Sequence, residues 1–129
     1  MMRDLDKQIS VVTTIAPAAA ATATTTGTTV DLAGYRSAAV VLHTGVFTDG
    51  TFTPTVEESD NDSDWSTVDA ADLSGAFVAV TSSNDATIYE VGYLGSKRYI
   101  RLLMTETVAS AGAFFSATVV RGDPITAPA

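Results

Sequence analysis

The sequence predicts an all-β protein, a single β-sandwich of either the jelly-roll or the immunoglobulin-like type, with an extended N-terminal arm and a short C-terminal tail. Threonine and valine are abundant, whereas the lysine and glutamate that usually coat exposed helices are scarce. Turn signals recur about every ten residues along most of the chain, which is the spacing typical of a sandwich. The 129 residues suit one domain with its own core.

The arm is predicted at residues 1–29. Residues 9–15 have strand composition, and the alanine and threonine run after them predicts an extended connector or an edge strand. A flexible linker is the alternative on composition grounds. We expect the arm to contact a partner through its apolar side chains, namely Ile9, Val11 and Ile15.

The sandwich domain is predicted at residues 30–121 and opens with a short strand and turn at 30–35. The long run at 37–47 has hydrophobic residues on both faces. A strand of this kind lies centrally in a sandwich or at a subunit contact.

A hairpin follows the long strand. The pair Asp49-Gly50 tolerates the positive φ of a tight turn, and the return strand at 52–58 alternates between apolar and polar residues. Pro54 cannot donate a ladder hydrogen bond, so this strand is expected at an edge or with a bulge.

The second half of the domain is predicted to contain one short helix and four strands. The helix is expected at 67–73 because Ser66 to Asp69 resemble a capping box. The strands are expected at 76–80, 87–94, 98–105 and 113–121, before a tail at 122–129.

The net charge of −8 is concentrated in one region. Residues 57–72 contain seven acids and no Lys or Arg, and without these seven charges the rest of the chain stands at −1. Nucleic acid is therefore not an expected partner, because binding its backbone requires clustered Lys and Arg.

Several classes of site and location are disfavoured by what the sequence contains. There is no cysteine, so disulfides and thiolate metal sites are excluded. The first residues lack the apolar core of a signal peptide, and no run approaches the length of a membrane span. We expect a soluble product made in the cytoplasm, with no membrane partner.

Residues 60–64 resemble the start of a calcium loop, because hard cations take several carboxylate oxygens. An EF-hand loop starting here would need glycine and a bidentate acid where Trp65 and Ala71 stand, so that match fails. A solvated turn is the favoured interpretation. The candidate ligands of a cation site of another type are Asp60, Asp62 and Asp64.

No catalytic constellation is legible. His43 is the single histidine, it lies in an apolar strand, and no nucleophile-elbow motif or second zinc ligand accompanies it. We therefore expect no enzyme and no cofactor.

Trp65 is expected to pack over the end of the sandwich and to anchor the acidic turn at residues 59–64, with sugar stacking as the alternative. The one basic cluster consists of Lys97, Arg98 and Arg101, and Arg98 and Arg101 would point to opposite faces of a strand. They are expected either in solvent or in salt bridges with an acidic neighbour, for which the 57–72 region of another copy is one possibility. The side chains expected to take part in interactions outside the arm are Trp65, Arg98 and Arg101.

Three blocks of sequence resemble the head decoration, or capsid cement, proteins of tailed bacteriophages, and the likeness covers residues 30–105. The blocks are Val30-Asp31-Leu32-x-Gly34-Tyr35-x-Ser37-Ala38, Glu57-Glu58-Ser59-Asp60 leading to Trp65, and Val91-Gly92-Tyr93-Leu94-Gly95-Ser96-Lys97-Arg98-Tyr99-Ile100-Arg101. The arm and the tail have no counterpart in this likeness.

The resemblance implies a virion structural protein that binds the outer surface of the capsid as a homotrimer. Its partner would be the major capsid protein, and its role would be to stabilise the shell after synthesis in the host cytoplasm. Extended arms and many weak copies suit such a role. The alternatives are a head–tail connector or tail component, and a carbohydrate- or calcium-dependent binding module.

Overall fold

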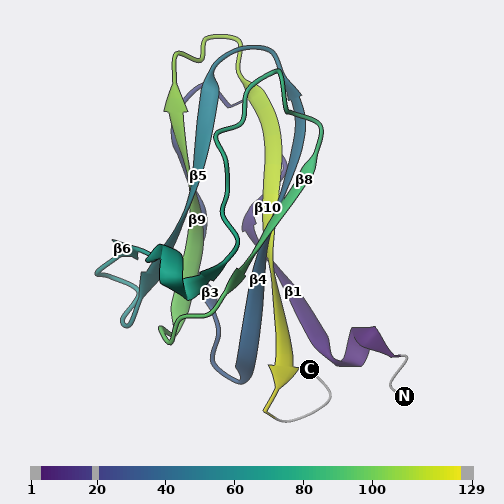
Figure 1. The fold of residues 1–129 in the computed structure, drawn as a ribbon, viewed down its shortest axis with the longest axis vertical. Helices are drawn as coiled ribbons and strands as arrows, with labels where there is room; N and C mark the ends of the chain where they lie inside the picture. The colour runs from purple at the N-terminus through teal and green to yellow at the C-terminus, as the bar shows by residue number, and fades with distance from the viewer. Residues whose placement is uncertain (1–3, 19–20, 126–129) are drawn as a thin grey trace.

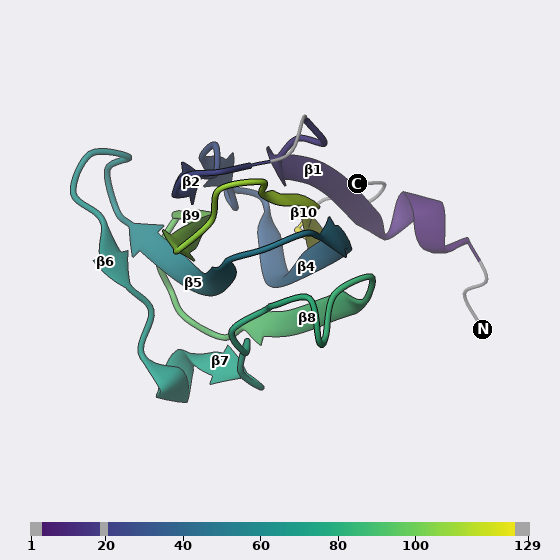
Figure 2. The same ribbon diagram turned by 90° about the horizontal axis from the view of Figure 1, so that it is seen from above.

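The computed structural model describes residues 4–18 and 21–125, and it consists of two antiparallel sheets packed face to face (Figure 1, Figure 2). The predicted all-β sandwich is confirmed. Sheet A has five strands in the order β1-β10-β4-β8-β7, and sheet B contains β2, β9, β5 and β6 in that order, with β3 also paired to β9.

The strands of sheet A are β1 (Ile9–Ile15), β4 (Tyr35–Phe47), β7 (Leu73–Ser74), β8 (Ile88–Tyr93) and β10 (Ala113–Pro124). Those of sheet B are β2 (Thr25–Thr26), β3 (Val30–Asp31), β5 (Thr51–Ser59), β6 (Ser66–Thr67) and β9 (Tyr99–Thr107). Two 3₁₀ turns, η1 (Leu5–Lys7) and η2 (Ala70–Asp72), complete the described elements.

The long strand β4 lies in the middle of sheet A, between β10 and β8. Val40 and Leu42 point into the core and are fully buried, whereas Val41 between them faces outward. The strand predicted from hydrophobic residues on both faces is therefore confirmed as central in the sandwich.

The backbone hydrogen bonds of β5 explain why proline is tolerated at residue 54. The backbone groups of Phe52 bond to Val80, and the carbonyl of Val56 accepts from Val68, so even-numbered residues of β5 turn their backbone away from β9. The missing N–H of Pro54 thus falls on the edge of the sheet, between these two contacts. Pro54 itself is buried, as the alternating pattern predicts.

The hairpin between β4 and β5 is tied to the turn between β9 and β10. The Asp49 carboxylate accepts hydrogen bonds of 2.8–3.1 Å from the backbone N–H groups of Ser110, Ala111 and Gly112, and one from the Ser110 hydroxyl. These donors stabilise the ionised carboxylate and hold the pKa of Asp49 well below its usual range. The Ser110 hydroxyl makes the largest contribution.

Two predicted elements of the second half are wrong. The helix expected at 67–73 is replaced by β6, η2 and β7, and Asp69 before η2 makes no side-chain cap. The strand expected at 76–80 is a loop in which only Val80 pairs, with Phe52. The chain turns at Gly75, which has a φ of +103°. Most side chains between Gly75 and Val80 are exposed, so this segment does not pair with a strand despite its strand-like composition.

The core lies between the sheets and is made almost wholly of inward-facing strand residues. One end contains three aromatic rings, Phe47, Phe52 and Phe115, with centroids 5.2–6.3 Å apart in edge and tilted arrangements. Ile100, Leu102 and Met104 of β9 continue the core and are fully buried.

The segment expected as an N-terminal arm contributes strands to both sheets. β1 pairs with β10 along the edge of sheet A, and β2 pairs with β9. Between them, the buried Thr14 hydroxyl donates to the Thr28 carbonyl (2.8 Å) and accepts from the Leu102 N–H (3.3 Å). Gly27 is packed so closely here that a Cβ would stand 2.6 Å from the Leu102 carbonyl oxygen. Of the expected tail, residues 122–124 belong to β10, and residues 126–129 lie outside the described part.

Candidate functional site

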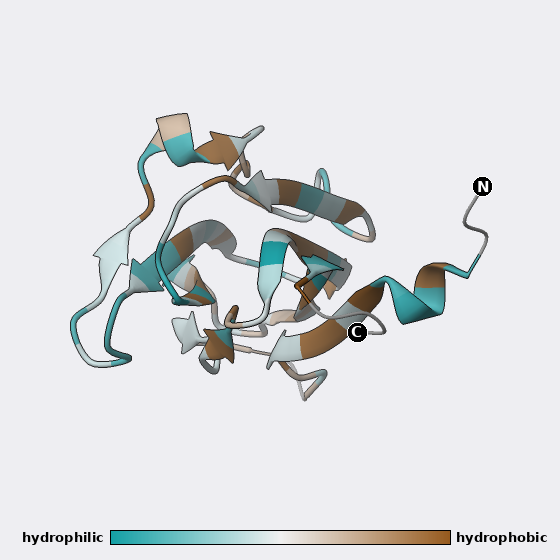
Figure 3. Cartoon of the chain, turned by 90° about the horizontal axis from the view of Figure 1, so that it is seen from below, coloured by the Kyte–Doolittle hydropathy of each residue, from teal (hydrophilic) through white to brown (hydrophobic). Residues whose placement is uncertain are grey.

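Charged and aromatic side chains of β3, β5, β8, β9 and the loops after β5 and β8 meet at one end of the sandwich. The loop at 59–64 projects from this part of the fold (Figure 1, Figure 3). We call this set the polar network. Its members are Asp31, Glu57, Glu58, Asp60, Trp65, Tyr93, Lys97, Arg98 and Arg101.

The outer face of sheet B holds the first part of the network. Glu57 on β5 lies opposite Arg101 on β9, and the Arg101 Nε donates to the Glu57 Oε1 at 2.8 Å. The Arg101 guanidinium also lies 4.1 Å from the centroid of the Trp65 ring. Because the side chains of Arg101 and Glu57 are only 22% and 15% exposed, this is a half-buried ion pair. Trp65 is therefore held against the sheet, as expected of a residue that anchors the acidic turn.

The second part joins β3 to the residue before β9, and Arg121 on β10 contacts the same strand from outside the network. Arg98 donates through Nε and a terminal nitrogen to the two carboxylate oxygens of Asp31, at 2.9 and 2.8 Å. This bidentate pair lowers the pKa of Asp31 to about 2 and raises that of Arg98. Arg121 donates to the Asp31 carbonyl and to the Ser10 hydroxyl, with its guanidinium 4.5 Å from the Tyr35 ring centroid.

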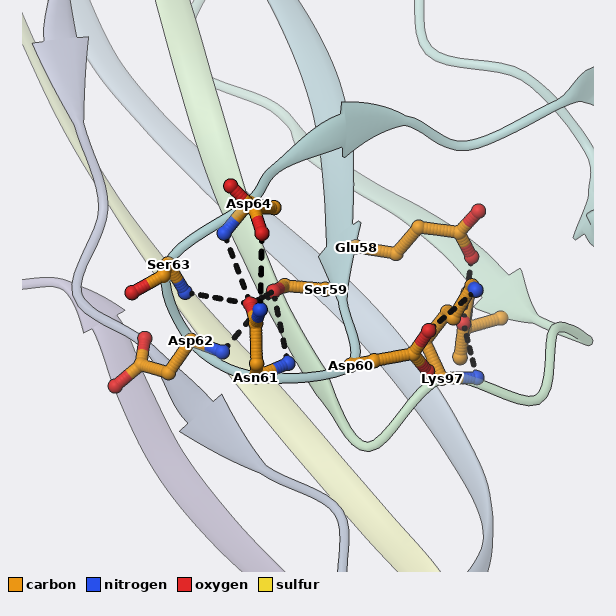
Figure 4. Close-up of polar contacts among 9 residues, drawn as sticks. Glu58, Ser59, Asp60, Asn61, Asp62, Ser63, Asp64 and Lys97 are labelled. Carbon is orange, nitrogen blue, oxygen red and sulfur yellow. Dashed lines mark hydrogen bonds and ion pairs between the residues drawn. The ribbon is translucent and has the colours of Figure 1, made fainter.

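The third part bridges the two sheets. The Tyr93 hydroxyl donates to Glu58 at 2.7 Å and accepts from the backbone N–H of Lys97 at 3.1 Å. Burial and the nearby Glu58 carboxylate raise the pKa of Tyr93 well above its usual range. The Lys97 ammonium in turn pairs with Asp60 at 2.7 Å (Figure 4), which raises the pKa of Lys97.

The acidic turn is held by its own polar groups. The Ser59 hydroxyl accepts from the N–H groups of Asn61 and Asp62, and the Asn61 side-chain oxygen accepts from those of Ser63 and Asp64, at 2.9–3.2 Å. These are turn-stabilising bonds of the kind expected for a solvated turn.

The three candidate cation ligands do not converge. Asp60 faces Lys97, and Asp64 accepts from the Asn61 side chain (Figure 4). Asp62 points elsewhere and accepts from the Thr29 hydroxyl. Across residues 4–18 and 21–125, no group of three or more His, Cys, Asp or Glu side chains is placed to hold a metal ion.

The polar network joins the three blocks of sequence that carry the resemblance. Asp31 comes from the first block, Glu57 and Asp60 from the second, and Arg98 and Arg101 from the third. The basic cluster finds its acidic partners within the same chain, including two from the 57–72 region. These contacts connect β3, β5 and β9 with the loops at this end of the sandwich.

Some of these contacts have little signal in the sequence. Tyr93 and Glu58 lie on strands of different sheets, and only the fold brings them together. Arg121 could have been noticed as a lone cation after two valines in a strand, a pattern that indicates a partner for its charge.

The remaining predicted interaction residues lie on β1. The side chain of Val11 is 57% exposed and Ile9 is partly buried, so both lie at the surface. Ile15 is 6% exposed and belongs to the core. β1 is the long edge strand of the described fold, since the edge strands β2, β3, β6 and β7 have two residues each.

His43 lies on the outer face of sheet A, between Ser116 on β10 and Ile88 on β8. In the described ranges, no helical segment is long and apolar enough to cross a membrane.

The fold is similar to that of a known phage-related protein. The PBSX exported protein XepA matches over 98% of this chain with a TM-score of 0.59 and 20% sequence identity. The match covers 40% of the XepA chain, so this chain spans less than half of that protein. No protein-family model matches the sequence, and no curated protein matches it. The similarity to XepA establishes a shared β-sandwich fold.

Proposed function

We propose that this chain is a virion structural protein of a tailed bacteriophage, and specifically a capsid decoration protein. It would bind the outer surface of the shell of major capsid protein as a homotrimer and stabilise that shell. The proposal includes the absence of enzymatic activity, of a cofactor and of nucleic-acid binding.

The observation that carries the proposal is that the three blocks of the resemblance are joined by the polar network. Their charged residues pair with one another across the first, second and third blocks. The residues that carry the resemblance therefore lie together in the fold rather than at scattered positions. The phage-related protein XepA, with the same fold, supports the broader assignment to phage.

The edge strand β1 is the proposed attachment point for the shell. Ile9–Ile15 contains no charged residue and no proline, which are the usual means of blocking an edge. In the described part of the chain, the Thr28 side chain and backbone N–H bond to the carbonyls of Thr13 and Thr14 and to no other carbonyl of this edge. An extended segment of the major capsid protein can add to the remaining residues by β-augmentation, with Ile9 and Val11 beside it.

The charges at the polar network support a second contact with the shell, separate from the edge of β1. Lys97, Arg98 and Arg101 are neutralised within the chain, whereas several carboxylates of the acidic turn remain exposed. A basic patch on the shell is the complementary surface.

The test is the copy number of this protein in purified particles, measured against the major capsid protein by quantitative mass spectrometry. A ratio near equality is expected for a protein that covers the shell. A ratio corresponding to a single ring would place the protein in the connector or tail, and absence from particles would refute the virion role.

A second measurement tests the attachment point. Particles lacking the protein are mixed with wild type, with Val11→Pro, and with Val78→Pro as a control in a loop that carries no strand. Val11→Pro is expected to weaken binding because proline blocks the edge. Equal binding of both variants would contradict attachment through β1.

A further inference from the structure

A recess of about 300 Å³ opens between the acidic turn and the loop after β8. This volume is at the lower end of the range for ligand sites, so the recess suits one side chain or one small molecule. An indole ring, an amide and an ammonium group line it together with carboxylates. The lining includes Glu58, Asp60, Asn61, Asp64, Trp65 and Lys97.

The carboxylates of the recess are held in place by donors of the same chain. Each of the three accepts one side-chain hydrogen bond of 2.7–2.9 Å, and the donors are Asn61, Tyr93 and Lys97 (Figure 4). No donor among the described residues bonds to the second oxygen of any of the three. The recess therefore presents acceptors that are already positioned, and a ligand would need to order these side chains little on binding.

The charge of the recess favours a cation over a neutral or an anionic ligand. Its three carboxylates are opposed by one ammonium group, so it carries two negative charges at neutral pH. The ion pair beside it, Arg101 with Glu57, is neutral as a pair. The negative charge is thus local to the recess, where it attracts a positively charged group.

The placement of the carboxylates disfavours a bare metal ion as that cation. A hard cation such as Ca²⁺ takes about six to eight oxygens around one point. Asp60 and Asp64 instead bond to different partners, Lys97 and Asn61. Within residues 4–18 and 21–125, no three acidic or histidine side chains gather around one point. An organic cation with several N–H donors can bond to acceptors that lie apart.

Trp65 narrows the organic cation to a guanidinium. Its ring lines the recess, and the Arg101 guanidinium lies over one face of that ring, 4.1 Å from the centroid. The same guanidinium bonds to the Glu57 carboxylate at 2.8 Å, so the chain already combines this indole with a guanidinium and a carboxylate. A guanidinium stacks on aromatic rings and carries five N–H donors in one plane, whereas an ammonium is compact and more strongly hydrated.

We propose that the recess binds an arginine side chain of a partner protein, with the guanidinium beside the Trp65 ring and hydrogen-bonded to Asp60 and Asp64. The inference deepens the proposed function and rests on it for the identity of the partner, because the major capsid protein would supply the arginine. The preference for a guanidinium depends on the recess alone, so it can be tested without particles.

The first test titrates the free, full-length protein with N-acetyl-arginine amide. Trp65 is the single tryptophan, so its indole N–H gives one resonance in a proton–nitrogen correlation spectrum. This resonance is expected to shift and saturate with a dissociation constant of about a millimolar, as for one small ligand. N-acetyl-citrulline amide, the neutral isostere, is expected to bind at least about tenfold more weakly. An indole resonance that does not shift, equal binding of the citrulline compound, or tighter binding of methyl glucoside would overturn the assignment.

Two variants make the same change of charge inside and outside the recess. Asp64→Asn removes one charge of the recess and keeps a side-chain oxygen that can accept from Asn61. Asp69→Asn removes one charge from an exposed residue of the 57–72 region that does not line the recess. Asp64→Asn is expected to raise the dissociation constant for N-acetyl-arginine amide about three- to tenfold, and Asp69→Asn less than about twofold. Equal effects would mean that the whole acidic region attracts the ligand, and would refute the recess as its site.

A particle assay separates this inference from the proposed function. Particles lacking the protein are mixed with wild type and with the two variants, and Asp64→Asn is expected to bind more weakly than Asp69→Asn. Equal binding of the variants to particles, with arginine binding intact in solution, would refute the shell as the source of the arginine. High copy number in particles without arginine binding would refute the recess alone. Absence from particles with arginine binding intact would refute the virion role alone.

Discussion

Replacing Arg101 tests whether the polar network stabilises the fold. The substitution Arg101→Met keeps an unbranched side chain that replaces the apolar stem of arginine, and it removes two contacts of the guanidinium. One is the 4.1 Å stacking on the Trp65 ring, and the other is the 2.8 Å hydrogen bond to Glu57. Glu57, 15% exposed, would lose its positive partner.

The magnitude follows from the burial of the pair. A cation over an aromatic ring contributes about 0.5–2 kcal/mol, depending on desolvation. Removing one partner costs about 0–1 kcal/mol for an exposed ion pair and about 3–5 kcal/mol for a buried one. This pair lies between these limits, and the two contributions overlap in the same group. We expect a loss of about 2–3 kcal/mol in the free energy of unfolding.

The assay is urea unfolding at neutral pH, followed by fluorescence and far-UV circular dichroism. Trp65 is the single tryptophan, so fluorescence reports on the site itself, while circular dichroism reports on the sheets. The matched control is Arg36→Met, since the Arg36 side chain is 56% exposed and lies 3.6 Å from Asp123. That change is expected to alter the free energy of unfolding by less than about 0.5 kcal/mol.

A double-mutant cycle with Glu57→Gln separates the pair from the rest of the site. A coupling energy of about 1 kcal/mol or more is expected, because the two groups are in direct contact. If Arg101→Met destabilised the protein no more than Arg36→Met, or if the coupling were within error of zero, the network would have no stabilising role.

Two further predictions concern other contacts. Gly27→Ala is expected to destabilise the protein by about 1–3 kcal/mol in urea unfolding, because the added methyl group meets the Leu102 carbonyl and Thr14; an unchanged midpoint would show that β1 and β9 can move apart freely. The pKa of Asp31, about 2 in the folded protein, lies below its unfolded value. Its contribution to stability is therefore full above about pH 4 and is lost as the pH falls toward 2. The difference in unfolding free energy between wild type and Asp31→Asn should shrink over this range, and a constant difference would contradict the assigned cause of the shift.

The longer strands of the two sheets were predictable from the sequence. β4, β5, β8, β9 and β10 each match an expected strand, because apolar and β-branched residues fill each run and turn signals separate the runs. Residues 76–80 have similar composition, yet only Val80 finds a partner. Composition describes what a segment can do, whereas pairing depends on which strands lie beside it.

The candidate site was predictable only in its parts. The acidic turn, Trp65 and the basic cluster stand out in the sequence, and the turn is solvated and held by its own bonds as expected. The pairing of Arg101 with Glu57 depends on the register of β9 against β5. That register is a long-range property, and no local pattern specifies it.

The position of β10 has a consequence for how the chain folds. β1 and β4 are made early, yet both pair with β10, which lies between them and is separated from β1 by nearly the whole sequence. During synthesis, the edges of β1 and β4 that pair with β10 remain unpaired until β10 has left the ribosome. We therefore expect slow folding, dominated by contacts distant in sequence, and a period in which the unpaired strand edges are prone to aggregation. A chaperone that shields β4 until β10 arrives would raise the yield more than one that acts on the finished sandwich.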